Sequence, residues 1–112
     1  IKVDTLDNQL FESSRVDLIK IDVEGAELNV LRGGLNTITK FNPVIVFEYE
    51  LGASDAYDST PLELWDFFDK VKYNIYTLKN FVESPLPLSF AEFTEIYNSK
   101  KEHYFVARFR SL

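Results

Sequence analysis

The sequence contains no cysteine and no methionine, and it has a single histidine. Without cysteine the chain can form neither a disulfide framework nor a thiolate metal site, which suits a reducing compartment. No apolar run reaches the length of a membrane span and no signal-like segment opens the chain, so we expect no membrane contact and a cytoplasmic location. A chain that begins at Ile1 and lacks methionine is also expected to be a piece of a longer protein.

Positive charge is scarce as well. The 12 lysines and arginines are outnumbered by 18 aspartates and glutamates, which gives a formal net charge of -6. A face that binds nucleic acid needs a cluster of basic residues, and Lys100-Lys101 is too short to form one, so we expect no nucleic-acid partner. The chain is instead rich in apolar residues (46%) and aromatic residues (15%), which is enough for 112 residues to fold as one packed domain.

The first half of the sequence predicts two buried strands separated by helix. β-Branched residues indicate a strand near Asp17 to Val23, buried on both faces as in a parallel sheet. Apolar residues at three- and four-residue spacing then predict a helix from Gly25 to Arg32, which Gly33-Gly34 interrupts before it continues over Leu35 to Phe41. A second apolar run predicts a buried strand over Val44 to Glu48.

The second half continues the alternation. Thr60 begins a helix as its N-cap, a strand follows over Tyr73 to Leu78, and the prolines of Phe81 to Leu88 favour an extended loop. Ser89 caps another helix, and His103 to Phe109 forms a closing strand. The order of elements predicts a layered α/β fold with a mostly parallel sheet, helices on its faces and an antiparallel last pair of strands.

Acidic residues follow both buried strands of the first half. Asp22 and Glu24 come directly after the first strand, and Glu48 ends the second. Ligands of open α/β sheets bind outside the carboxyl ends of the strands, so these three acids are the candidate catalytic residues. Structural alternatives remain, because Asp22 could pair with its neighbour Lys20 on the same face and Glu24 could cap the following helix. Glu27, in the first helical turn, is expected to stabilise that helix.

The histidine and the glycines offer no other site. His103 lies far along the chain from the acids, so we predict a surface or strand-pairing residue. Gly25 and Gly33-Gly34 lack the spacing of a dinucleotide or phosphate-binding loop.

Several segments of the first half together resemble a known family. Leu18 to Glu27 reads LIKIDVEGAE, and Val30 to Gly34 reads VLRGG. Val3 to Asp7 (VDTLD) precedes them and Pro43 to Glu48 (PVIVFE) follows. These segments are similar to the signature of the FkbM-type methyltransferases, which use S-adenosylmethionine to methylate oxygen atoms, often of sugars or polyketides.

The resemblance implies a fold and a domain organisation. The expected fold is part of the Rossmann-like sheet of a class I methyltransferase. Residues 1–112 would form the C-terminal portion of a single methyltransferase domain, lacking the N-terminal half that holds most of the cofactor. The strand from Leu18 to Asp22 would then have an open edge, through which we expect the chain to self-associate.

The resemblance also implies a function. Asp22 would lie beside the transferring methyl group as base, hydrogen-bond acceptor or ligand of a possible divalent cation, with Glu24 and Glu48 nearby. The substrate would be a small molecule with a hydroxyl group, and S-adenosylmethionine would be the cofactor, to which no residue of this chain is assigned. The chain alone is expected to be inactive.

Two other functions remain open. Asp22, Glu24, Glu48 and Glu50 could together bind Mg²⁺ in a hydrolase or isomerase, because oxygen ligands suit this ion. Alternatively, the chain could be a folded interaction module without a catalytic site.

Overall fold

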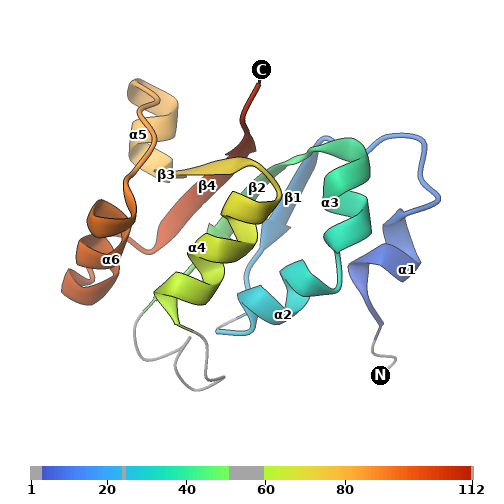
Figure 1. Ribbon diagram of the computed structural model, residues 1–112, viewed down its shortest axis with the longest axis horizontal. Helices are drawn as coiled ribbons and strands as arrows, with labels where there is room; N and C mark the ends of the chain where they lie inside the picture. Colours follow the sequence, from blue (N-terminus) through green and yellow to red (C-terminus); the bar gives the residue numbers. More distant parts are fainter. Residues whose placement is uncertain (1–3, 24, 51–59, 112) are drawn as a thin grey trace.

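The computed structural model describes residues 4–23, 25–50 and 60–111. In these ranges the strands are β1 (Leu18–Ile21), β2 (Val44–Glu48), β3 (Tyr73–Thr77) and β4 (Tyr104–Phe109), and they form one open sheet in the order β1-β2-β4-β3 (Figure 1). β1 and β2 are parallel, whereas β4 is antiparallel to both of its neighbours. The predicted α/β architecture and the antiparallel last strand are confirmed. The expectation of mostly parallel pairing is wrong, because two of these three strand pairs are antiparallel.

β4 occupies the interior of the sheet, between β2 and β3. Its central residues, Phe105, Val106 and Ala107, are at most 1% exposed. Because β4 runs against β2, the residues that begin β4 lie at the carboxyl end of β2, where Glu48 is opposite Tyr104. A late segment of the sequence therefore reaches the edge at which the acids are found.

The core lies between the sheet and a layer of helices. The helices are α1 (Leu6–Leu10), α2 (Glu27–Arg32), α3 (Leu35–Phe41), α4 (Pro61–Lys70), α5 (Leu78–Glu83) and α6 (Phe90–Ser99). Apolar residues of α2, α3, α4 and α6 pack in one cluster with the sheet, where the ring of Phe47 stacks on Phe68 at 5.3 Å and on Phe105 at 5.7 Å. No helix in the described ranges is long and apolar enough to cross a membrane.

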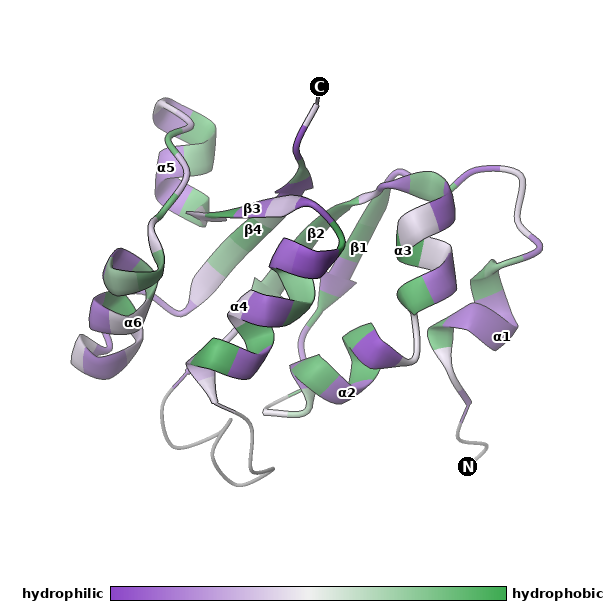
Figure 2. Cartoon of the chain, in the orientation of Figure 1, coloured by the Kyte–Doolittle hydropathy of each residue, from purple (hydrophilic) through white to green (hydrophobic). Residues whose placement is uncertain are grey.

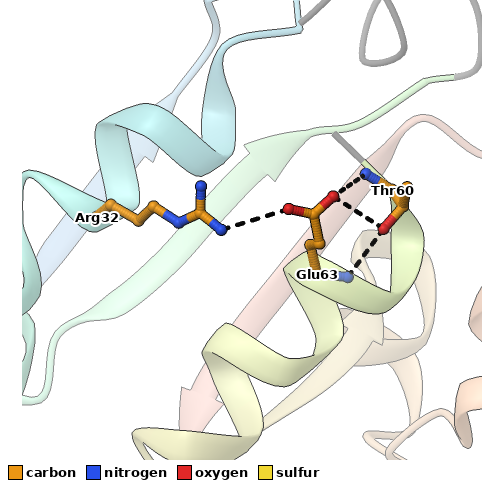
Figure 3. Close-up of polar contacts among 3 residues, drawn as sticks. All are labelled: Arg32, Thr60 and Glu63. Carbon is orange, nitrogen blue, oxygen red and sulfur yellow. Dashed lines mark hydrogen bonds and ion pairs between the residues drawn. The ribbon is translucent and has the colours of Figure 1, made fainter. Parts of the chain in front are cut away.

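The predicted helix starts at Thr60 and Ser89 are confirmed. The Thr60 hydroxyl accepts a hydrogen bond from the Glu63 backbone N–H at 3.2 Å, and the Glu63 carboxylate accepts one from the Thr60 backbone N–H at 3.2 Å. The other carboxylate oxygen of Glu63 lies 3.5 Å from the Arg32 guanidinium, which joins the end of α2 to the start of α4 (Figure 3). Exposed ion pairs contribute little, so the reciprocal cap is the main local stabilisation of α4.

The predicted loop over Phe81 to Leu88 is wrong at its start, since α5 extends to Glu83. Thr77 ends β3 and also caps α5, because its hydroxyl accepts a hydrogen bond from the Asn80 backbone N–H at 3.0 Å. Pro85 restricts only Ser84, the residue directly before it, so it leaves the preceding helical turn undisturbed.

The prediction that β1 is buried on both faces is also wrong. Ile19 and Ile21 face the helices and are buried, whereas Leu18 is 62% exposed and Lys20 is exposed on the opposite face. Figure 2 shows mostly hydrophobic residues in β1 and β2, and both hydrophobic and hydrophilic residues in the helices. In the described ranges β1 therefore has an open outer edge and a largely uncovered face.

α1 packs against the junction of α2 and α3. Asp7 accepts hydrogen bonds from the backbone N–H groups of Thr37 at 2.8 Å and Asn36 at 3.1 Å, at the start of α3. Burial opposes the ionisation of Asp7, but these hydrogen bonds outweigh it and lower its pKa. The close approach depends on Gly34, since a Cβ atom there would lie 3.0 Å from Leu6 Cδ1 and 3.2 Å from Leu6 Cβ.

Gly34→Ala is expected to lower the free energy of unfolding by about 1 kcal/mol, because the added methyl group overpacks the contact with Leu6. Urea denaturation measures the change. In a Leu6→Ala background the same substitution should cost less, since Leu6 Cδ1, the nearer of the two obstructing atoms, is absent. An equal cost in both backgrounds would contradict this explanation.

Candidate active site

The carboxyl ends of β1 and β2 lie side by side because these strands are parallel. Ile21 is in register with Phe47, so Asp22, the next residue, lies beside Glu48. Lys20 and Asp22 are both exposed, and they form no ion pair in the described part of the chain. The structural alternative for Asp22 is therefore wrong, while its catalytic role stays a prediction.

The pKa of Glu48 is raised above the ordinary value for a glutamate. Glu48 is partly buried, and burial is the largest cause of its raised pKa. Hydrogen bonding and charge repulsion with Asp22, and then with Glu50, raise the pKa further. Glu48 ionises against the negative charges of two neighbouring carboxylates, so it holds a proton to higher pH than an ordinary glutamate.

Two residues that sequence reasoning did not place at this site come from the start of β4. Tyr104 is opposite Glu48, and its pKa is raised first by the negative charge of Glu48, then by burial and by Asp22. His103 Nδ1 lies 3.9 Å from Glu50 Oε2. The backbone carbonyl of His103 accepts a hydrogen bond from the Tyr49 backbone N–H at 2.8 Å, so the prediction of a strand-pairing histidine is confirmed. The available signal was topological, since an antiparallel strand begins where its neighbour ends.

Glu27 lies under the same edge and has a structural role. Glu27 is only 1% exposed, and its carboxylate accepts a hydrogen bond from the Gly25 backbone N–H at 2.9 Å. Gly25 has φ 105°, a conformation that favours glycine, and so it allows the tight turn between β1 and α2. Burial raises the pKa of Glu27, and hydrogen bonds from the backbone of Gly25, Glu27 and Val23 partly offset this rise.

Glu24 lies outside the described residues. No group of three or more histidine, aspartate or glutamate side chains arranged to hold a metal ion occurs among residues 4–23, 25–50 and 60–111. The magnesium-site alternative therefore gains no support from the described carboxylates.

The side chains at this edge form a negatively charged group that can accept a proton. Asp22, Glu48 and Glu50 supply carboxylates, and Tyr104 supplies a phenol that its raised pKa keeps protonated. Such a group of residues can accept a proton from a hydroxyl and can stabilise a nearby positive charge.

Comparison with known proteins identifies the family of the chain. A model of the methyltransferase FkbM domain matches residues 1–75, about two thirds of the 112-residue chain, and it includes β1, β2 and α4. No curated protein and no solved structure matches the chain. The chain belongs to the FkbM methyltransferase domain family.

Proposed function

We propose that this chain is the acceptor-side portion of an S-adenosylmethionine-dependent O-methyltransferase domain that acts on a hydroxyl group of a small molecule. The observation that supports this most is the contact between the Asp22 and Glu48 carboxylates at the carboxyl ends of two parallel strands, in a member of a methyltransferase family. Glu24 belongs to the same proposal by its position in the sequence.

The strand directions support a Rossmann-like class I sheet as part of this proposal. β1, β2 and β3 share one direction, and only β4 of the described strands runs against them. We assign residues 1–112 to the C-terminal portion of one methyltransferase domain, with a cytoplasmic location. The remainder of the domain would belong to the full-length protein.

The described residues fit one end of the cofactor. S-adenosylmethionine supplies an electrophilic methyl group on a positively charged sulfur. The carboxylates of Asp22 and Glu50 each interact with that of Glu48, and together the three complement a positive charge. The sequence offers no glycine-rich loop for the nucleoside, so we assign nucleoside binding to the N-terminal half of the domain and expect the chain alone to be inactive.

The residues of this chain would handle the proton of the acceptor hydroxyl. Asp22 is exposed at the edge and can reach a bound acceptor, whereas Glu48 is partly buried behind it. Either carboxylate can accept the hydroxyl proton, and a carboxylate with a raised pKa is the stronger base once it is ionised. Holding the hydroxyl in line with the reacting carbon is the other contribution of the protein.

A labelled methyl group tests this function. The full-length protein is expected to transfer the label from S-adenosylmethionine to hydroxyl-bearing small molecules, as an ether that survives alkali. Calorimetric binding of Mg²⁺ with no response to the cofactor would contradict the proposal and favour the hydrolase or isomerase. Unchanged transfer by Asp22→Ala would contradict the assignment of the site and favour an interaction module.

We also propose self-association of the isolated chain through the β1 edge. This edge is open in the described ranges, and Leu18 beside it is 62% exposed. Open strand edges pair with other chains. Sedimentation velocity of residues 1–112 should detect a dimer that Leu18→Lys weakens, whereas Leu62→Lys, at a 52% exposed position on α4, leaves it unchanged. A monomeric wild-type chain would contradict the proposal.

A further inference from the structure

The acidic edge, formed by Asp22, Glu48 and Glu50, is joined by Tyr104, which comes from outside the family match, as does His103. The match ends at residue 75, whereas Tyr104 begins β4. Tyr104 is 42% exposed, although the three residues after it are at most 1% exposed. Packing in the core therefore does not account for a tyrosine at this position.

The register of the sheet places the Tyr104 side chain in one row with the acids. Val46 is opposite Val106 and Glu48 is opposite Tyr104, and alternate residues of a strand share a face. Lys20 is in register with Val46, so Asp22, two residues further along, continues the row on the other side of Glu48. Glu48 therefore has Asp22 on one side and Tyr104 on the other.

We propose that Tyr104 is a positioning residue for the acidic edge: its hydroxyl donates a hydrogen bond to the Glu48 carboxylate and holds it in place. Asp22, on the far side of Glu48, is then the carboxylate that is free to face the acceptor. This role rests on the proposed methyl transfer, although the contact itself does not.

The chemistry of the two groups supports this direction of the hydrogen bond. The phenol of Tyr104 stays protonated, as its raised pKa indicates, and an ionised carboxylate can only accept, so the hydrogen bond runs from Tyr104 to the ionised Glu48. A donor favours the ionised form of the carboxylate and opposes the effect of the neighbouring acids.

Other titratable and charged groups also lie on or next to the acidic edge, and the test must separate their effects from that of Tyr104. They are Asp22 and Lys20 on the β1 side, Glu50 after β2, His103 before β4, and Glu27 below the turn that follows β1. None of them changes in a Tyr104→Phe variant, which removes one oxygen atom from an exposed side chain.

The experiment follows the titration of Glu48 by carbon NMR of the full-length protein labelled in its glutamate carboxyl groups. Tyr104→Phe is expected to raise the titration midpoint of Glu48 by roughly one pH unit, because the ionised form loses a donor. Tyr76→Phe is the matched control. Its hydroxyl lies 3.3 Å from the Arg108 guanidinium. Tyr76 is on β3, and β4 lies between β3 and the strand that carries Glu48.

Methyl transfer gives the second readout. Tyr104→Phe should lower kcat/KM roughly tenfold at neutral pH and move the acidic limb of the pH profile upward by the same shift. An unchanged Glu48 midpoint, or equal shifts in both variants, would overturn the inference. A shifted midpoint in a protein without methyl transfer would uphold the contact and instead refute the proposed reaction.

Discussion

Glu48→Gln in the full-length protein is expected to lower the rate of methyl transfer by about 10²- to 10⁴-fold, the usual contribution of general acid–base catalysis. Asp22→Asn should have a loss in the same range, because the two carboxylates lie side by side at the edge of the sheet. Initial rates with labelled S-adenosylmethionine measure both losses. A rate within twofold of wild type for both variants would contradict the assigned site.

The same Glu48→Gln substitution should raise the stability of the fold at neutral pH. The pKa of Glu48 is raised in the folded state, first by burial and then by Asp22 and Glu50. Its contribution to stability is therefore full below the unfolded pKa and is lost as the pH rises through the folded pKa. The variant should unfold at higher urea concentration than wild type at neutral pH, and this advantage should shrink as the pH falls toward 4.

Glu83→Gln is the matched control for this experiment. Glu83 is exposed at the end of α5, so its substitution removes one negative charge without changing the acidic edge. An equal stabilisation by Glu83→Gln would assign the effect to the net charge of -6 rather than to the contact with Asp22.

Glu27→Ala is expected to lower the free energy of unfolding by about 2–4 kcal/mol. The substitution leaves a cavity at a position that is 1% exposed, and it removes the acceptor of the Gly25 backbone N–H. Glu27→Gln keeps one acceptor oxygen and removes a buried charge. Its free energy of unfolding should therefore lie between those of wild type and Glu27→Ala.

Urea denaturation at pH 7 ranks the Glu27 variants. Glu12→Ala, which truncates an exposed acid, should remain within about 0.5 kcal/mol of wild type. A Glu27→Ala variant as stable as the Glu12→Ala variant would show that the turn after β1 does not depend on the buried carboxylate.

The elements of the fold were predictable where local chemistry determines them. Thr60 and Ser89 each precede a glutamate at capping-box spacing, and both helices begin at the predicted residue. The run from Val44 to Glu48 was predicted as a strand and is β2. α5 was missed because Thr77 both ends a strand and caps a helix, a combination that apolar periodicity does not reveal.

The acidic edge was predictable only in part. Asp22 and Glu48 follow strands whose apolar runs are visible in the sequence, so their proximity follows from parallel pairing. Tyr104 and His103 reach the same edge because β4 is inserted between β2 and β3. The position of β4 depends on pairing between segments that are far apart in the sequence, and patterns of neighbouring residues do not reveal such pairing.

The interior place of β4 has a consequence for how the chain is made. On the ribosome, β2 and β3 are synthesised before β4 and have no pairing with each other to close the gap between them. A nascent chain therefore exposes two strand edges until β4 has left the exit tunnel, a state prone to aggregation. A premature stop codon shortly before Tyr104 would remove the central strand of the sheet together with one side of the acidic edge.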